Sequence, residues 1–217
     1  MPYIEVIDVC KSYRNIQVLV NCNAQFNRGL IHGIVGRNGS GKTQLFKCIC
    51  GYVIPESGYV LVDKKRIGHG LPYPPSLGLI LEQPGFLPQF SAQTNLALLM
   101  GLTGKPDKSE IKQALRCVGL LESANKRVGK YSMGMRQRLS IAQAIMEKPE
   151  LLILDEPFNG LDKAGVEEIR ALLLELKGEG RTILLASHNP YDIDLLCDTV
   201  HEMDAGVISK VVDKSSL

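Results

Sequence analysis

Residues 36–43 have the composition and spacing of a phosphate-binding loop. They read GRNGSGKT, which fits the pattern G-x-x-x-x-G-K-[ST]. In this pattern glycines let successive backbone N–H groups turn inward around a phosphate, Lys42 adds a mobile positive charge, and the Thr43 hydroxyl can bind Mg²⁺. A chance match arises at about one position in thirty thousand, so chance is a poor explanation in this chain. The residues expected to bind the nucleotide are Gly36, Asn38, Gly39, Ser40, Gly41, Lys42, Thr43 and Gln44.

The segments on either side of this loop have the structure that such a loop requires. Residues 30–35 (LIHGIV) form a short apolar, β-branched run, and residues 44–50 (QLFKCIC) continue as an apolar segment of helix length. A phosphate loop joins a strand to a helix N-terminus. The alternative is a glycine-rich turn with an exposed lysine, which requires neither the preceding strand nor the following helix.

Two carboxylates follow a second apolar run, at residues 151–154 (LLIL). Paired acids at the end of a strand are seldom packing residues. In a phosphate-loop protein the first, Asp155, would hold Mg²⁺ through its waters, and the second, Glu156, would point at the attacking water. The alternative is a pair of solvated acids at the start of a loop.

Two more polar residues follow buried-strand runs. Gln83 comes directly after residues 77–82 (LGLILE), and His188 lies two residues beyond residues 182–186 (TILLA). Open α/β sheets bind ligands at the carboxyl ends of their strands, so we expect Gln83 near the ligand and His188 at a phosphate. Without that placement, a lone histidine would be read as structural or solvent-exposed.

The N-terminal segment places an aromatic residue where it could meet a base. Residues 3–9 and 17–20 are rich in β-type residues and flank a predicted polar turn at 11–15, which presents Tyr13. Its ring either stacks on a purine or packs at a sheet edge. The segment by itself does not decide between them.

The order of elements predicts an α/β fold. It consists of a P-loop NTPase core with a mixed central sheet, an N-terminal antiparallel β part and an inserted helical subdomain. Residues 91–148 carry helical signals, including Asp107 with Glu110 as a capping box, and no convincing strand. We expect one domain, 1–217, whose nucleotide-binding core comprises 1–90 and 149–217 and whose helical subdomain is 91–148.

Composition narrows the function classes. The chain is 45% hydrophobic with a net charge of +2, which is too balanced to indicate nucleic-acid binding through bulk charge. No apolar run is long enough to cross a bilayer, and the start lacks a signal-peptide core, so we expect a cytoplasmic protein. Its six cysteines form no C-x-x-C pair, and we expect reduced thiols.

Together these motifs resemble the ATP-binding cassette (ABC) family, the nucleotide-binding subunits of ABC transporters, over essentially the whole chain. The matching elements are the A-loop at Tyr13, Walker A at 36–43, the Q-loop at Gln83, Walker B at 151–156, the D-loop at 159–162 and the switch histidine at His188.

The family signature, usually Leu-Ser-Gly-Gly-Gln, would be residues 131–135, which read YSMGM. Three of five positions depart from it, but the Ser132 hydroxyl and the Gly134 N–H at a helix N-terminus are kept. Met133 and Met135 put in doubt only the contacts of the usual glycine and glutamine. This form, followed by Arg-Gln-Arg, looks like the variant of drug, bacteriocin and peptide-antibiotic exporters.

The resemblance implies an ATP-hydrolysing subunit that dimerises on ATP and drives transport, by expectation export, through a separate transmembrane permease. It would pair with a second copy or a homologous cassette, bind no nucleic acid, and lie on the inner face of the cell membrane. Its cofactors would be ATP and Mg²⁺. The implied catalytic residues are Glu156, His188, Lys42 and Gln83; Tyr13, Ser132, Gly134 and Asp162 would join the nucleotide contacts, and Thr43, Gln83 and Asp155 would hold the metal.

Other nucleotide-binding classes fit less well. A GTPase needs Asn-Lys-x-Asp, whereas Asn125-Lys126 is followed by Arg127-Val128. A small-molecule kinase gives no reason for the signature, D-loop and His188 together. The main alternative is a soluble ABC ATPase acting on a macromolecular complex. DNA-repair types insert long coiled coils and translation types join two cassettes, and this chain has neither.

An apolar, proline-broken segment at residues 84–90 starts the helical region. Phe86, Leu87 and Phe90 need not all reach the core, and a partly exposed apolar patch often marks a docking surface. We expect a cytoplasmic helix of the permease to dock there. The alternative is that these residues anchor the loop to the helical subdomain.

Overall fold

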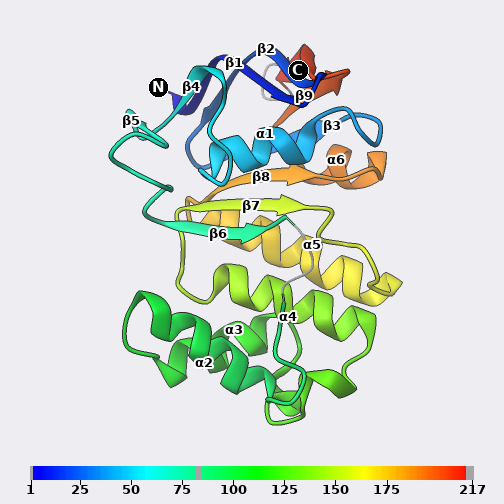
Figure 1. Cartoon of the computed structure of the whole chain (residues 1–217). Helices are drawn as coiled ribbons and strands as arrows, with labels where there is room; N and C mark the ends of the chain where they lie inside the picture. Colours follow the sequence, from blue (N-terminus) through cyan, green and yellow to red (C-terminus); the bar gives the residue numbers. More distant parts are fainter. Residues whose placement is uncertain (1, 82–84, 214–217) are drawn as a thin grey trace.

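The computed structural model describes residues 2–81 and 85–213. Its central sheet has the order β10-β9-β3-β8-β7-β6, in which β9 and β10 are antiparallel and all other neighbours are parallel. The sheet is therefore mixed, as predicted (Figure 1). Its strands are β3 (Ile31–Val35), β6 (Leu77–Ile80), β7 (Leu151–Asp155), β8 (Thr182–Ala186), β9 (Thr199–Asp204) and β10 (Val207–Asp213).

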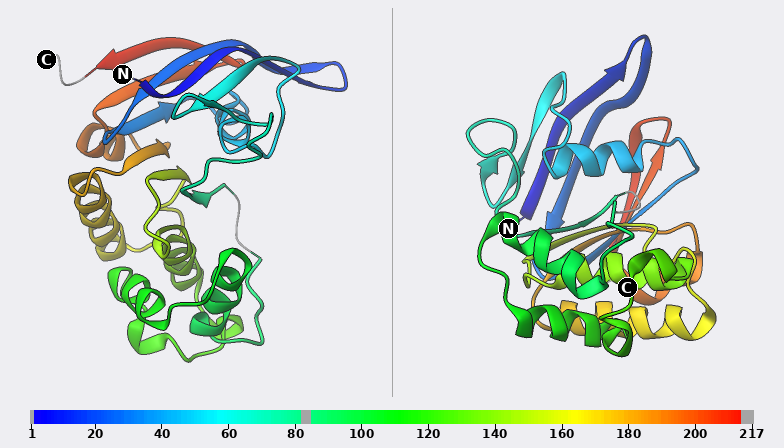
Figure 2. Two further views of the ribbon diagram at one scale, coloured as in Figure 1. Left: turned by 90° about the vertical axis from the view of Figure 1, so that its left-hand side faces the viewer. Right: turned by 60° about the horizontal axis from the view of Figure 1, so that its bottom comes forward.

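A second, antiparallel sheet lies above the first and has the order β2-β1-β4-β5. It contains both long N-terminal strands, so the predicted antiparallel β part is confirmed. The strands are β1 (Pro2–Tyr13), β2 (Ile16–Asn27), β4 (Ser57–Val62) and β5 (Lys65–Arg66). Figure 2 shows this sheet at the opposite end of the molecule from the residue 92–145 helices.

Both faces of the central sheet are covered, which explains the continuous apolar run before Asp155. Successive side chains of a strand point to opposite faces. Leu152 and Leu154 belong to the core cluster shared with α4 and α5, whereas Leu151 and Ile153 belong to the cluster shared with α1. A strand buried on both sides reads as uniformly apolar. β7 thus fixes the position of Asp155, its last residue, and of Glu156, which follows it.

The helix α1 (Lys42–Ile49) lies between the two sheets, where Leu45, Phe46 and Ile49 are fully buried. The remaining helices are on the other side of the central sheet. They are α2 (Ala92–Thr103), α3 (Lys108–Cys117), α4 (Met133–Ile145), α5 (Lys163–Gly178) and α6 (Pro190–Leu196), with short 3₁₀ turns at Leu121–Ser123 and Val128–Lys130. α2, α3 and α4 follow β6 and precede β7, so the predicted helical region contains helices.

The start of α3 differs in detail from a capping box. The Asp107 carboxylate accepts hydrogen bonds from the N–H groups of Ser109 (2.7 Å) and Glu110 (3.4 Å), as expected. Glu110 does not return toward Asp107. Its carboxylate instead accepts a hydrogen bond from the Lys148 ammonium at 2.8 Å. Lys148 lies just after α4, within reach of the Glu110 side chain.

The predicted polar turn at 11–15 is wrong in extent. β1 continues through Tyr13, and only Arg14 and Asn15 form the turn, with Arg14 at a φ of 56°. The polar residues before it pair across the hairpin, with Tyr13 opposite Ile16. Strand pairing satisfies their backbone groups and leaves their side chains at least partly exposed, so composition alone did not reveal the strand.

A buried polar chain links β3 to β9 in the central sheet. His32 Nε2 donates to the Asn27 carbonyl (2.8 Å), and its Nδ1 accepts from the Thr199 hydroxyl (2.6 Å). The Thr199 oxygen in turn accepts from His201 Nε2 at 3.3 Å. Among the described residues His201 Nδ1 has no hydrogen-bond partner, and burial lowers the pKa of both imidazoles.

Candidate functional site

The phosphate loop joins β3 to α1, as its flanking sequences predict. Gly41 has a φ of 108°, and a Cβ there would come within 2.7 Å of the Val18 carbonyl oxygen. It is the N-cap of α1 and provides no side-chain hydrogen bond to the first turn. The first N–H groups of a helix have no partner within the helix and carry positive partial charge, so this end of α1 can receive an anion.

The Lys42 ammonium lies over the loop. Its Nζ donates to the carbonyl oxygens of Gly36 (2.7 Å) and Arg37 (3.1 Å), and the residue is 9% exposed. Backbone carbonyls thus hold the charge at the loop, where it can exchange them for phosphate oxygens.

Thr43 and Asp155 meet across the site from α1 and β7. The Thr43 hydroxyl donates to Asp155 Oδ2 at 2.5 Å. Burial raises the pKa of the Asp155 carboxyl; the Thr43 hydrogen bond lowers it, and the Glu156 charge adds to the rise. A nearby cation would favour the charged form of this carboxyl.

Glu156 and His188 form a contact that the sequence did not specify. His188 Nδ1 lies 2.7 Å from Glu156 Oε2. Because an ionised carboxylate only accepts hydrogen bonds, Nδ1 carries the proton and Nε2 is left for another group. Glu156 has a φ of 51°, in the left-handed region, and its N–H donates to the Ala186 carbonyl of β8 at 2.9 Å. This backbone hydrogen bond to β8 thus fixes Glu156, at the end of β7, beside His188 in the loop that follows β8.

The phosphate loop and the two acids line a cavity of about 630 Å³, a size typical of small-molecule sites. Its wall includes most of the phosphate loop together with Asp155 and Glu156. Met133 and Gln137, one turn apart on α4, also line it. Of the predicted residues, Asn38, Gly39, Ser40, Gly41, Lys42, Thr43, Gln44, Asp155 and Glu156 line the cavity.

Comparison with known proteins agrees with this geometry. The family model described as "ABC transporter" matches residues 19–159. The chain belongs to the ABC transporter family. It is 40% identical to the uncharacterized ABC transporter ATP-binding protein YybJ of Bacillus subtilis (strain 168). The match covers 94% of this chain and 93% of YybJ. It is also 40% identical to the bacitracin transport ATP-binding protein BcrA of Enterococcus faecalis, over 99% of this chain and 70% of BcrA.

The predicted fold class is confirmed by a solved ABC structure. The dimeric ATP-binding cassette MJ0796, bound to ADP and Pi, aligns with a TM-score of 0.89 at 22% identity, over 97% of this chain and 98% of that one. This likeness shows the P-loop fold, and the family model and the relatives above show an ABC ATPase subunit. In the ranges 2–81 and 85–213, no helix is both long enough and apolar enough to span a bilayer.

The ABC signature lies at the start of α4. Ser132 is its N-cap, and the hydroxyl accepts from the Met135 N–H at 3.2 Å. A Cβ on Gly134 would come within 2.9 Å of the Gly160 carbonyl oxygen, so the signature lies against the D-loop of its own chain. Asp162 caps α5 by accepting from the Gly165 N–H (2.9 Å). Ser132, Gly134 and Asp162 do not line the cavity of the phosphate loop.

Tyr13 lies beside the Walker A helix. Its hydroxyl donates to Gln44 Oε1 at 3.1 Å, and the residue is 44% exposed. The ring is therefore not packed away at a sheet edge, although it does not line the cavity. Gly36 and His188 also lie outside the lining, and the predicted Q-loop residue Gln83 falls outside the described part of the chain.

Sequence reasoning missed Gln137 and Val18 in the cavity wall. Gln137 is held by its side-chain amide, which donates to the Pro157 carbonyl at 2.9 Å. The spacing of four between Met133 and Gln137 places both on one helix face, which was an available signal. Val18 lies on β2 in a run of β-type residues, which gave no sign of a site.

Proposed function

We propose that this ABC subunit binds Mg-ATP in the Walker A cavity, hydrolyses it between two cassettes, and so drives export through a separate transmembrane permease. The observation that carries the proposal is the 2.7 Å contact between His188 and Glu156 at the edge of that cavity. A pure binding module would need neither group. A carboxylate oriented by an imidazole beside a phosphate loop is the arrangement that hydrolysis requires.

In the proposed mechanism, Lys42 and the α1 N–H groups bind the β- and γ-phosphates. Glu156 takes a proton from the attacking water as general base. His188 keeps that carboxylate in place through Nδ1 and offers Nε2 to a phosphate oxygen. The geometry supports this division of roles because Glu156 lines the cavity, whereas His188 contacts Glu156 without lining it.

The residues fit Mg²⁺ as the metal. Thr43 and Asp155 present a hydroxyl and a carboxylate 2.5 Å apart, and Mg²⁺ prefers such oxygen donors. Burial raises the pKa of Asp155, a cost that a cation would offset. We propose Thr43 as a direct ligand, Asp155 as one acting through water, and Gln83 as a third. When bound, the ion would neutralise charge on the transferred phosphate.

A second cassette would complete the site. Ser132 is exposed and does not reach the phosphate loop of its own chain, so we propose that its hydroxyl and the Gly134 N–H contact the γ-phosphate of an opposite subunit, with Asp162 and the rest of the D-loop at the interface. The dimeric form of MJ0796 supports this arrangement. The second cassette is another copy of this chain or a homologue.

We further propose that the cargo is a peptide antibiotic or a similar molecule and that the direction is outward. The support is the similarity to a protein named for bacitracin transport. The permease, rather than this chain, would contact the cargo. In this role the chain lies on the inner face of the membrane. We also propose that residues 1–90 and 149–217 act as the nucleotide-binding core and 91–148 as the subdomain that moves against it.

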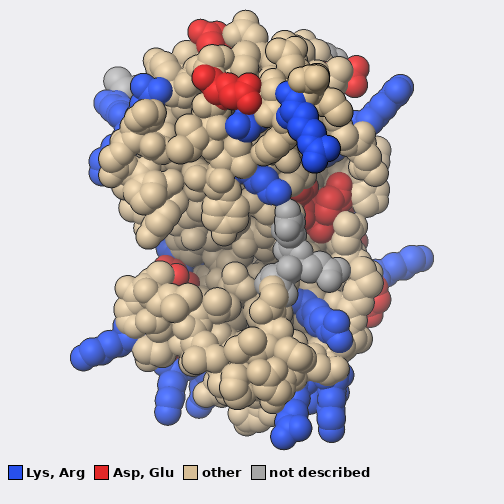
Figure 3. Space-filling view, viewed as in Figure 1, with Lys and Arg blue, Asp and Glu red and all other residues tan. Residues whose placement is uncertain are grey.

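The permease would dock on the segment 85–90. Backbone contacts already anchor this segment, since Asn95 Oδ1 accepts from the Leu87 N–H (2.7 Å) and Val128 N–H donates to the Phe90 carbonyl (2.9 Å). The side chains of Leu87 and Phe90 nevertheless remain about 40% exposed. Figure 3 shows many Lys and Arg side chains at the outline of the molecule and several others within this face. Phe86 packs against the core, so Phe90→Asp is a sharper test of docking than Phe86→Asp.

The test of the catalytic proposal is Glu156→Gln. General-base catalysis contributes about 10²- to 10⁴-fold, so phosphate release should fall by that factor while Mg-ATP binding persists and an ATP-loaded dimer accumulates in size-exclusion chromatography. Glu150→Gln, at the other end of β7, is the matched control and should keep wild-type turnover. Loss of nucleotide binding in Glu156→Gln would make Glu156 a structural residue.

A further inference from the structure

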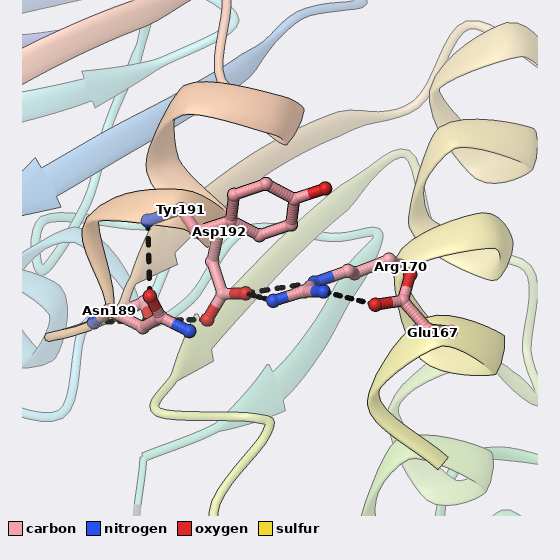
Figure 4. A network of polar contacts seen from close by, with 6 residues as sticks. Glu167, Arg170, Asn189, Tyr191 and Asp192 are labelled. Atoms are coloured by element: carbon pink, nitrogen blue, oxygen red, sulfur yellow. Dashed lines mark hydrogen bonds and ion pairs between the residues drawn. The ribbon is translucent and has the colours of Figure 1, made fainter. Parts of the chain in front are cut away.

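A buried polar network joins α5 to α6 and to the residues on either side of His188 (Figure 4). Arg170 in the middle of α5 reaches Asp192 on α6. Its Nε donates to Asp192 Oδ1 at 2.9 Å, and Nη2 donates to the same oxygen. Both side chains are almost entirely removed from solvent, at 7% and 2% exposure. Burying two charges costs as much as their attraction returns, so stability alone does not account for the pair.

The second oxygen of Asp192 leads to His188. Asp192 Oδ2 accepts from the Ser187 hydroxyl (2.9 Å), and the Ser187 oxygen accepts from the Asn189 N–H (3.2 Å). The single hydroxyl proton is committed to the carboxylate, so the Ser187 oxygen can only accept from Asn189. The direction of each bond is therefore fixed. The network holds the residues immediately before and after His188.

His188 itself is poorly restrained by packing. Its side chain is 70% exposed, in contrast to the buried residues behind it. On the far side Asn189 Oδ1 accepts from the Tyr191 N–H (3.1 Å), and the Tyr191 ring stacks on the Arg170 guanidinium at 4.7 Å. Thus the network holds the backbone at His188, while the exposed imidazole is held by its hydrogen bond to Glu156.

We propose that Arg170, Asp192 and Ser187 are positioning residues for ATP hydrolysis: they hold the His188 backbone so that Nδ1 stays within hydrogen-bond distance of Glu156. This inference rests on the proposed roles of Glu156 and His188. A misplacement of about 1 Å in a catalytic group can lower a rate by about a hundredfold. The Ser187 hydroxyl is the only link in the described network from Asp192 to the Asn189 N–H, so its loss should act on the rate.

The experiment uses three single variants of the full chain. Ser187→Ala should lower kcat by about ten- to a hundredfold and leave the equilibrium Kd for ATP unchanged, and Ser187→Thr should restore the rate because it keeps the hydroxyl. Glu167→Ala is the matched control. It removes the exposed partner of the same guanidinium, 2.5 Å away, without touching Asp192, and should hydrolyse ATP like wild type. Thermal unfolding sets an assay temperature at which all variants are folded.

A double variant separates positioning from general support of the fold. In a His188→Ala background, Ser187→Ala should cause no further loss, because the residue it positions is gone. An equal loss in both backgrounds, or wild-type kcat in Ser187→Ala, would overturn the inference. If His188→Ala alone kept full hydrolysis, the proposed catalytic pair would fail and this inference with it. An inactive His188→Ala with an active Ser187→Ala would overturn the positioning role alone.

Discussion

Two helices of this molecule begin at places where a phosphate is expected, and they begin differently. α1 starts at Gly41, which offers no side chain to its first N–H groups, and the Lys42 that follows is almost buried. α4 starts at Ser132, whose hydroxyl already accepts from Met135, and the Met133 that follows is 60% exposed. The first start is left open for a ligand within one chain. The second is satisfied on its own and faces solvent.

This difference indicates a site that is only half organised in a single chain. An uncapped helix start without a ligand leaves N–H groups without a partner in the helix, which is tolerable where an anion binds. A serine cap removes that need, because its oxygen accepts from the helix N–H while its proton stays available to donate to a phosphate oxygen. ATP would therefore bind first to the α1 side of one chain and only later to the α4 side of another.

Lys42→Ala removes the charge at the start of α1. Without the ammonium that lies over the loop, the charge on the β- and γ-phosphates is not compensated, and we expect hydrolysis to fall more than about a hundredfold, with weaker nucleotide binding. Phosphate release and ATP titration measure the two effects. Lys112→Ala, on the exposed side of α3, is the control. Wild-type turnover in Lys42→Ala would show that α1 is not the phosphate end.

Ser132→Arg should abolish hydrolysis equally but leave ATP binding by the single chain intact, because Ser132 lies outside the cavity. If the cassette self-pairs, mixing this variant with Lys42→Ala gives mixed dimers with one intact site, and activity should partly return. Wild-type specific activity should also rise with protein concentration. Full activity of a strict monomer would contradict the two-chain site.

The two helix starts also show which parts of the site could be predicted from the sequence. The phosphate loop is local: eight consecutive residues specify it, and their flanks specify its strand and helix. The same holds for the acids after β7. For α4 the sequence carries only part of this information. The spacing of Met133 and Gln137 puts both on one helix face, but that face reaches the cavity only through tertiary packing.

Residue types in the sequence did not predict which side chains contact one another. Glu156 and His188 were both predicted, but their contact arises because β7 and β8 are neighbours in the sheet. The network of Arg170, Asp192 and Ser187 gave no pattern in sequence, since its members lie on three separate elements. The β1–β2 hairpin was underestimated near its turn, where Lys11 and Ser12 are polar although they belong to β1.

Acid should destabilise the fold at a position away from both helix starts, the buried His201 on β9. Burial, with His32 beside it, lowers the pKa of His201 to about 4. The unfolded chain, with an ordinary pKa of about 6.5, then binds more protons below that pH. We expect the free energy of unfolding to be unaffected above about pH 6.5 and to fall by about 3 kcal/mol as the pH drops toward 4.

Urea unfolding at several pH values tests this expectation. His201→Gln should flatten the decline, whereas His69→Gln, an exposed histidine, should keep it. The Lys42 and Ser132 variants should follow the wild-type pH dependence. An undiminished slope in His201→Gln would assign the acid sensitivity to another group.

The smallest expected effect separates the cap of α4 from its proposed phosphate contact. Ser132→Ala should lower the free energy of unfolding by about 1 kcal/mol through loss of the N-cap, measured by urea titration. Ser132→Asn should restore stability, since asparagine caps equally well, without restoring hydrolysis. If Asn restored both, the serine would matter only as a cap, and the contrast between α1 and α4 would lose its functional meaning.

The left-handed backbone of Glu156 has a consequence for engineering this protein. A non-glycine residue at a φ of 51° costs about 1–3 kcal/mol in backbone strain, which glycine avoids. A screen for heat resistance alone would therefore favour Glu156→Gly, a change that removes the proposed base. At this position selection for robustness and selection for turnover oppose each other, so any stabilised version of the chain must be assayed for hydrolysis at every round.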